Sequence, residues 1–188
     1  HEGMIFDGTK FFESASATTL PSELAIECLL YCGENPIWTR IFEFSANTTG
    51  NNRFLLYLNG SVIKLKIDDT DILWVDGIVN NNWYHVYISV GATSSTMNVR
   101  NASTSVEKPQ NHSKSIPSGP MDFFIGTSRN KTYTFNGKIA YLRLWRSVQY
   151  QNVSNLYDDR NKHPFAFRKT IGYPDMEILG DEFVHRKS

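Results

Sequence analysis

Apolar and polar residues alternate through most of the chain, in short runs separated by Gly, Asn, Asp and Pro. The clearest run is "RFLLYLNGSVIKLKID", residues 53 to 68. Apolar residues alternate up to Asn59-Gly60, a pair that tolerates the positive φ angles of a type I′ turn, and alternate again after it. A period of two is that of a strand with one buried face. The run therefore predicts a β-hairpin centred on Asn59-Gly60, and the whole pattern predicts an all-β chain.

Further strands are expected wherever the alternation returns, and "GMIFDGTKFFESA" predicts a first hairpin around Asp7-Gly8. The polar, Pro-containing segment 103–120 predicts a long surface loop. Near the end, Val153, Leu156 and Tyr157 have the spacing of one apolar helix face. The sequence thus predicts a two-sheet antiparallel jelly-roll sandwich with one short C-terminal helix. The other expected strands are 24–32, 39–46, 71–77, 80–90, 95–103, 121–128 and 137–145.

The two cysteines, Cys28 and Cys32, lie in the alternating stretch "AIECLLYC". Four residues along a strand span about 13 Å, which is beyond the reach of a disulfide. Both cysteines share a strand face with Ile26 and Leu30. We therefore expect two unpaired thiols packed in the core as small apolar side chains.

Charge and composition exclude some partners and favour an exposed location. The 188 residues carry 19 basic and 19 acidic side chains without a basic stripe, which argues against nucleic acid. No apolar run approaches the roughly 20 residues of a membrane helix, so no membrane insertion is expected. The chain begins with His1, which suggests a fragment of a larger multidomain or oligomeric protein. Six N-x-S/T sequons favour an extracellular or virion-surface location, at Asn47, Asn59, Asn101, Asn111, Asn130 and Asn152.

Four motifs occur in an order that resembles a known group of domains: "FDGTKFFESA", "NNWYHVYISV", "FFIGTS" and "FNGKIAYLRLWRSVQYQNVSNLY". The chain resembles laminin-G-like and pentraxin-like domains of the concanavalin A-like superfamily. The resemblance implies a sandwich over residues 1–164, with 165–188 as a C-terminal tail or extra edge strand. It also implies structural roles for Trp83, His85 and Trp145. Because this fold carries lectins, glycosidases, adhesion modules and viral spike heads, it leaves function open.

The sequence gives no sign of an enzyme. Retaining glycosidases need two carboxylates about 5 to 5.5 Å apart, and no strand offers such a pair. Glu23 and Glu27 are too far apart along an extended chain, and Glu43 stands alone between apolar neighbours. We expect no catalysis and no catalytic residues, with a glycoside hydrolase as the least favoured alternative.

Calcium is the one cofactor that the chain could accommodate, because Ca²⁺ prefers clustered oxygen ligands. "KIDDTDILWVDG" contains three closely spaced carboxylates, Asp68, Asp69 and Asp71. Aspartates also favour turns through their own side-chain hydrogen bonds, and we prefer that interpretation. No cofactor is expected, and calcium is kept as an alternative.

The remaining polar and aromatic residues suggest recognition of sugars, whose rings offer an apolar face to aromatics and hydroxyls to amides and carboxylates. We predict a non-catalytic, lectin-like module that binds a cell-surface glycan or glycoprotein for host-cell attachment, as part of a surface or viral spike protein. A protein-binding adhesion or structural module is the alternative. The predicted binding residues are Trp38, Asp71, Trp74, Asp76, Asn81 and Tyr133.

Overall fold

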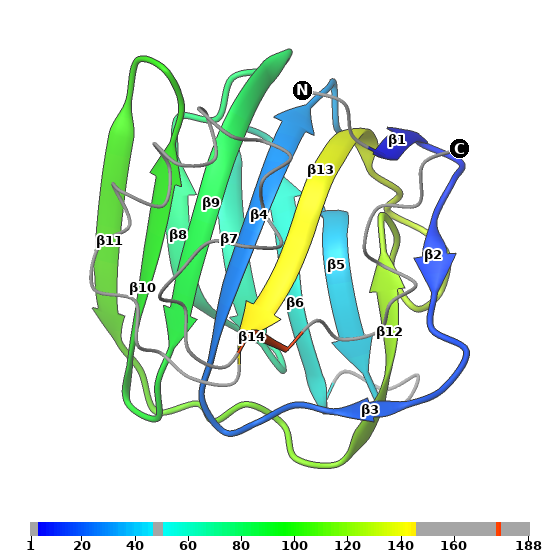
Figure 1. Cartoon of the computed structure of the whole chain (residues 1–188), viewed down its shortest axis with the longest axis vertical. Coiled ribbons are helices and arrows are strands. Elements are labelled where there is room, and N and C mark those ends of the chain that lie inside the picture. Colours follow the sequence, from blue (N-terminus) through cyan, green and yellow to red (C-terminus); the bar gives the residue numbers. More distant parts are fainter. Residues whose placement is uncertain (1–3, 47–50, 146–175, 178–188) are drawn as a thin grey trace.

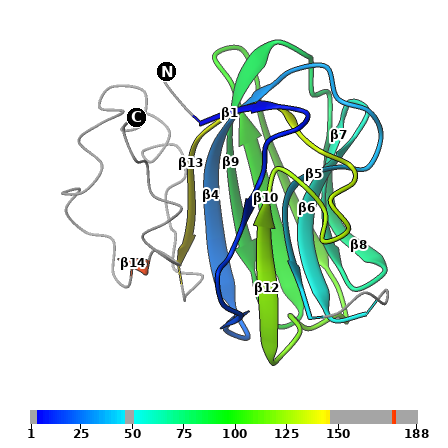
Figure 2. The ribbon, with the colours of Figure 1, turned by 90° about the vertical axis from the view of Figure 1, so that its right-hand side faces the viewer.

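The computed structural model describes residues 4–46, 51–145 and 176–177. Every regular element in this part of the chain is a β-strand, arranged in two antiparallel sheets that pack face to face (Figures 1 and 2). The predicted two-sheet sandwich is therefore confirmed. The predicted short helix around Val153 to Tyr157 lies outside the described residues. No helix in the described part is long and apolar enough to cross a membrane.

Sheet A has the strand order β1-β13-β4-β9-β10-β11, and β14 pairs with β13. Its strands are β1 (Met4–Asp7), β4 (Leu24–Cys32), β9 (Asn82–Val90), β10 (Ser94–Arg100), β11 (Ser105–Asn111), β13 (Asn136–Trp145) and β14 (Met176–Glu177).

Sheet B has the order β2-β12-β5-β6-β7-β8, and β3 pairs with β12. Its strands are β2 (Phe12–Glu13), β3 (Thr18–Thr19), β5 (Thr39–Ser45), β6 (Arg53–Asn59), β7 (Val62–Ile67), β8 (Thr70–Asp76) and β12 (Pro120–Ile125).

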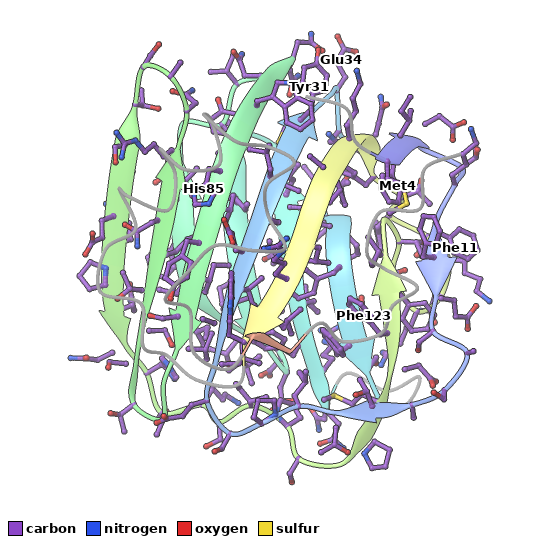
Figure 3. All side chains as sticks on the ribbon, in the orientation of Figure 1. Met4, Phe11, Tyr31, Glu34, His85 and Phe123 are labelled. Carbon is purple, nitrogen blue, oxygen red and sulfur yellow. The ribbon has the colours of Figure 1, made fainter. Side chains whose placement is uncertain are left out.

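The core lies between the sheets, where the inward half of each alternating strand is buried. Aromatic residues fill the part under β5, β6 and β12. Phe44 and Phe123 stack with ring centroids 4.1 Å apart, and Phe42 and Phe54 pack beside them; Phe123 is labelled in Figure 3. Burial of these large apolar surfaces is the main force that holds the two sheets together.

Both cysteines point into this core and are free thiols, as predicted. Burial raises the pKa of the Cys32 thiol to about 12. Because the thiolate is the reactive form, neither cysteine has the character of a redox or metal-binding group.

Residues 4 to 13 differ from the predicted hairpin. β1 pairs with β13 in sheet A, whereas β2 pairs with β12 in sheet B. The chain crosses between sheets just after Asp7, whose side chain accepts hydrogen bonds from the amides of Thr9 and Lys10. The segment "FDG" therefore joins the two layers, and the prediction of a local hairpin was wrong.

The hairpin of β6 and β7 is confirmed, but its turn lies one residue later than predicted. Asn59 pairs with Val62, so Gly60 and Ser61 are the central residues. Only Gly60 of the two has a positive φ, 62°, which is the pattern of a type II′ turn rather than type I′.

The predicted loop 103–120 contains a strand. Its residues 105–111 form β11, which pairs with β10 along seven residues at the edge of sheet A. Pro109 is tolerated there because an edge strand needs no amide donor on its open side. Almost all of β11 is exposed, so most of its residues are polar and show no alternation of apolar and polar side chains. A hydrophobicity pattern therefore does not predict this strand.

β13 occupies an inner position of sheet A, between β1 and β4. Leu142 and Leu144 face the core, and Trp145 is also buried. On neighbouring β9, His85 is buried and its Nε2 lies 2.9 Å from Oε1 of Glu27. Trp145 and His85 are thus both buried, and the structural roles expected for them stay predictions. Of the predicted tail 165–188, residues 176–177 pair with Leu144 and Trp145.

Candidate functional site on the outer face of sheet B

The outer face of sheet B carries charged and aromatic residues that a regular strand would not bring together. Within β5 the pairing with β6 shifts between Arg40 and Phe42. This bulge turns both Ile41 and Phe42 into the core, so Arg40 and Glu43, three residues apart, share the outer face. Bulges re-aim side chains in this way and are frequent next to functional sites.

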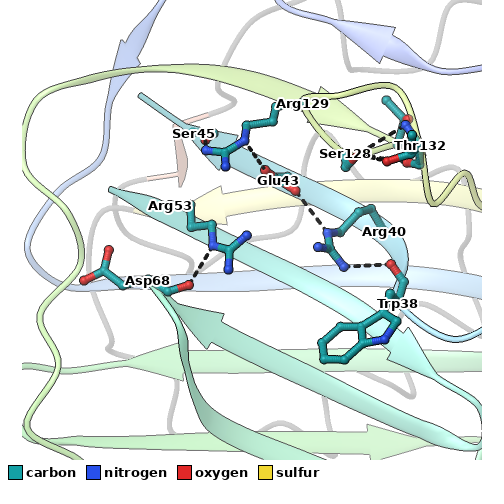
Figure 4. Close-up of polar contacts among 10 residues, drawn as sticks. Trp38, Arg40, Glu43, Ser45, Arg53, Asp68, Ser128, Arg129 and Thr132 are labelled. Atoms are coloured by element: carbon teal, nitrogen blue, oxygen red, sulfur yellow. Dashed lines mark hydrogen bonds and ion pairs between the residues drawn. The ribbon is translucent and has the colours of Figure 1, made fainter. Parts of the chain in front are cut away.

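Arg40 makes contacts with several other residues of this face (Figure 4). Its Nε donates to Oε2 of Glu43 at 3.0 Å, and its Nη1 donates to the carbonyl oxygen of Trp38 at 2.7 Å. Its main-chain amide donates to the carbonyl oxygen of Tyr133 at 2.9 Å. The guanidinium also lies over the rings of Tyr57 and Tyr133, 5.3 Å from each centroid. One buried arginine therefore fixes two loops and two aromatic rings.

The aromatic part of the face consists of Trp38, Tyr57 and Tyr133, here called the aromatic platform. Trp38 stacks on Tyr57 with centroids 5.4 Å apart and planes 8° apart. Trp38 is 38% exposed and Tyr133 48% exposed, whereas Tyr57 is buried. Trp38 and Tyr133 both adopt positive φ angles, 67° and 55°. This conformation is strained for bulky residues at a cost of about 1–3 kcal/mol each, and such strain clusters at binding sites.

Next to the platform, Asp71 is held by three side chains. It accepts a hydrogen bond from Tyr57 Oη at 2.7 Å and forms ion pairs with Lys64 and Lys66 at 3.0 and 3.5 Å. Burial raises the pKa of Asp71, but the hydrogen bonds from Tyr57 and Lys64 and the two ammonium charges lower it further, so the pKa falls below its usual range. Lys66 also lies over the rings of Trp38 and Tyr57. Asp71 therefore holds Tyr57, the buried member of the aromatic platform, through the hydrogen bond that it accepts from the phenol hydroxyl.

Asp71→Asn is expected to destabilise the protein by on the order of 1 kcal/mol at pH 7, because a partly buried network of charged hydrogen bonds is lost. A carboxyl group whose pKa is lowered on folding stabilises the native state above its unfolded-state pKa, near 3.8. That contribution is lost as the pH falls through the folded-state pKa. Urea unfolding should thus show a difference between wild type and Asp71→Asn that shrinks below about pH 4. Asp76→Asn, an exposed change on the same strand, is the control; an equal pH-dependent loss there would contradict the prediction.

A second group of charges lies beyond Arg40 on the same face. Arg129 donates to Ser45 Oγ at 2.8 Å, and its Nε lies 4.0 Å from Oε1 of Glu43. Arg53 donates from Nε to the main-chain oxygen of Asp68 at 2.7 Å. Burial and the charges of Arg53 and Arg40 lower the pKa of Arg129, against the opposing effect of Glu43. Glu43 is 1% exposed, so it is not the isolated carboxylate expected from the sequence but the shared partner of two arginines.

The structure brings some of the predicted site residues together. Trp38 and Tyr133 share the aromatic platform, and Asp71 supports it through Tyr57. A shift in the pairing of β7 and β8 places Trp74 and Asp76 on the same outer face, toward the edge of sheet B, with Trp74 opposite Lys64.

Asn81 belongs to a different part of the surface. Its amide donates to the carbonyl oxygen of Cys32, and its Oδ1 accepts a hydrogen bond of 3.4 Å from Tyr31. Both partners belong to β4 in sheet A, and Tyr31 is labelled at the end of that strand in Figure 3. The structure thus does not join Asn81 to the aromatic platform.

The three aspartates considered as calcium ligands do not converge. The carboxylate of Asp68 accepts from the amide of Asn52, that of Asp69 contacts Thr70 and Lys114, and that of Asp71 contacts Tyr57 and two lysines. No group of three His, Cys, Asp or Glu side chains suited to a metal ion occurs among the described residues. The donor set does not fit calcium, because each carboxylate is engaged by donors of the protein.

The site predicted from the sequence does not include Tyr57 or most of the charged residues of this face, which are Arg40, Glu43, Arg53, Lys64, Lys66 and Arg129. A signal was present in the outward half of each strand. Arg53, Leu55 and Tyr57 alternate with core residues on β6, and Lys64 and Lys66 do so on β7. The apolar residues at the inward positions of these strands predict the core. The polar and aromatic residues at the outward positions form the candidate site.

No protein-family model matches the sequence, and no curated protein matches it either. Solved structures do resemble the chain. A Ruminococcus gnavus sialidase CBM40 module, bound to α2,3-sialyllactose, superposes with a TM-score of 0.58 at 14% identity, over 76% of this chain and 92% of that one. A pentraxin from Limulus polyphemus gives 0.58 at 15% identity, over 78% and 76%. Mouse laminin α1 domains LG4-5 give 0.61 at 14% identity, over 77% and 40%.

These likenesses establish the fold. The chain has the same β-sandwich as pentraxins, laminin LG domains and the CBM40 module, which agrees with the resemblance drawn from the four motifs. The chain also resembles the enzymatically active domain of tailspike protein 2 from bacteriophage CBA120, of which it spans only 27%.

Proposed function

We propose that the protein is a non-catalytic carbohydrate-binding module that uses the aromatic platform and its surrounding charges on sheet B. The observation that carries the proposal is the pair of half-exposed aromatics, Trp38 and Tyr133, held by Arg40 in strained backbone conformations. Fixed aromatic faces stack on the apolar face of a sugar ring, and charged groups beside them bond its hydroxyls. Because the backbone is already fixed, binding orders few side chains.

The resemblance to a sialidase CBM40 module supports this proposal, since that structure contains a bound sialylated sugar and is covered over 92% of its length. We further propose that the module acts outside the cell or on a virion surface as part of a larger protein. The likeness to a section of a phage tailspike chain supports this view.

The absence of catalysis is part of the proposal. Glu43 is engaged by Arg40 and Arg129, and Asp71 by Tyr57 and two lysines. Cations and a hydroxyl group hold these two carboxylates, whereas glycoside hydrolysis uses a pair of carboxyl groups that flank the scissile bond. Incubation with a bound glycan should yield no cleavage products by mass spectrometry.

A protein-binding adhesion module remains the second candidate because of one observation. Ile37, next to Trp38, is 59% exposed, and an apolar aliphatic side chain suits a protein partner better than a sugar. Clustered exposed apolar residues are frequent at protein interfaces.

A glycan array followed by calorimetry on the glycans bound tests the proposal. Trp38→Ala and Tyr133→Ala are each expected to weaken binding at least roughly tenfold, the effect of losing a central aromatic contact. Tyr31→Ala, an aromatic substitution on sheet A, is the matched control and should bind as wild type. Circular dichroism checks that each variant is folded. If no glycan binds, or if Trp38→Ala binds as well as wild type, the proposal is wrong.

A further inference from the structure

Two arginines reach over the outer face of sheet B from opposite ends of neighbouring strands. On β5 and β6, Arg40 lies opposite Tyr57 and Arg53 lies opposite Ser45, with Glu43 and Leu55 paired between them. Figure 4 shows the amino ends of the two guanidinium groups turned toward one another beside Glu43. Two like charges therefore lie on the same outer face, on either side of the Glu43–Leu55 pair.

The guanidinium donors of these two residues are only partly used. Arg53 bonds Asp68 through Nε, and Arg40 uses Nε and Nη1 for Glu43 and Trp38. Within the described chain, both terminal amino groups of Arg53 and Nη2 of Arg40 have no acceptor. Arginine presents such donors in a planar fork that matches the two oxygens of a carboxylate.

The local charge balance is positive. Arg40 and Arg129 share one carboxylate, that of Glu43, and Arg53 bonds the main-chain oxygen of Asp68, whose carboxylate is directed to the amide of Asn52. Asp122 faces outward on β12 opposite Ser45, but it is exposed to solvent. Lys64 and Lys66 are paired with Asp71. Arg53 therefore has no carboxylate partner among the described residues, and an anion between Arg40 and Arg53 would supply its counter-charge.

We propose that this arginine pair binds the carboxylate of an acidic sugar, which makes the module selective for acidic glycans. The inference rests on the proposed function, because the sugar ring is held by the aromatic platform. Arg40 connects the two parts, since the same guanidinium lies over the rings of Tyr57 and Tyr133. A sugar ring on the platform would therefore direct its acidic substituent along the sheet toward Arg53.

Calorimetry with α2,3-sialyllactose and trigalacturonic acid, each compared with its methyl ester, tests this assignment. The acid of at least one pair should bind about tenfold to a hundredfold more tightly than its ester, as expected for charge-assisted hydrogen bonds. Arg53→Gln should abolish that preference, and Arg53→Lys should restore only a small part of it because lysine lacks the fork. Lys108→Gln, an exposed charge change on β11, is the control and should retain the full preference.

The outcomes separate this inference from the function on which it rests. Binding that depends on Trp38 but is equal for acid and ester, or unchanged in Arg53→Gln, overturns the inference and leaves the proposed function standing. If no glycan binds at all, the carboxylate site is tested by comparing the midpoint of thermal unfolding in sodium acetate with that in sodium chloride at equal ionic strength. A higher midpoint in acetate for wild type but not for Arg53→Gln supports the carboxylate site, and equal midpoints for wild type overturn it. Arg53→Gln must unfold cooperatively in each case.

Discussion

Gly137→Ala is expected to destabilise the fold by about 3 kcal/mol or more, because a methyl group at this position has no space. Gly137 lies in β13 between Phe6 of β1 and Cys32 of β4. A Cβ built there would come within 2.1 Å of the main-chain oxygen of Tyr31 and 2.7 Å of the ring of Phe135. The first of these contacts is to the backbone of β4, so relief requires β13 and β4 to separate.

Thermal and urea unfolding measure this effect. For a chain of this size, 3 kcal/mol corresponds to a fall in melting temperature of roughly 6–12 °C. Gly77→Ala is the control, since Gly77 also has a positive φ, 87°, but open space where a Cβ would lie. This substitution should lower the free energy of unfolding by only about 1–2 kcal/mol, the cost of placing alanine in a left-handed backbone conformation. Equal losses for the two variants would show that the close approach at Gly137 is not decisive.

Three of the four motifs that predicted the fold meet in close contacts at one corner of the sandwich. Phe6 of "FDG" lies against Gly126 of "FFIGTS", where a Cβ would meet the Phe6 ring at 2.3 Å. Phe135 and Gly137 of "FNG" close the same corner, since the Phe6 and Phe135 rings are 5.9 Å apart. Residues fixed by such tight contacts leave a recognisable pattern in the sequence. Exposed segments such as β11 leave none, because their pairing uses backbone groups common to all residues.

The binding face was predictable only in part, for a geometric reason. An alternating pattern assigns Arg40 and Phe42 to one face of β5 and Ile41 and Glu43 to the other. The bulge breaks this period, so that Ile41 and Phe42 both enter the core and Arg40 joins Glu43 outside. Bulges depend on the pairing of two strands, and one strand's sequence does not specify them. Trp38 and Tyr133 were found because loop aromatics stand out, whereas Arg40, which holds both, was not.

Arg40→Met is expected to destabilise the protein by about 3–5 kcal/mol, because it leaves Glu43 buried without its closest cation. Among the described residues, Arg129 would be the one cation left beside Glu43, with its Nε 4.0 Å from Oε1. The double variant Arg40→Met/Glu43→Leu removes both members of the pair and should recover more than half of the loss, since apolar replacement of a buried pair is nearly neutral. Lys64→Met, which breaks a more exposed pair with Asp71, should cost less than about 1 kcal/mol.

Binding distinguishes the two roles of Arg40 in these same variants. If Arg40 only neutralises Glu43, the double variant should regain glycan binding along with stability. If it also positions the platform, the double variant should be stable yet still bind weakly, because Trp38 and Tyr133 have both lost a guanidinium contact. We expect the second result, since two strained aromatic residues need an external constraint to keep their conformations. Full recovery of glycan affinity in the double variant would show that the backbone of these loops holds the aromatic rings without Arg40.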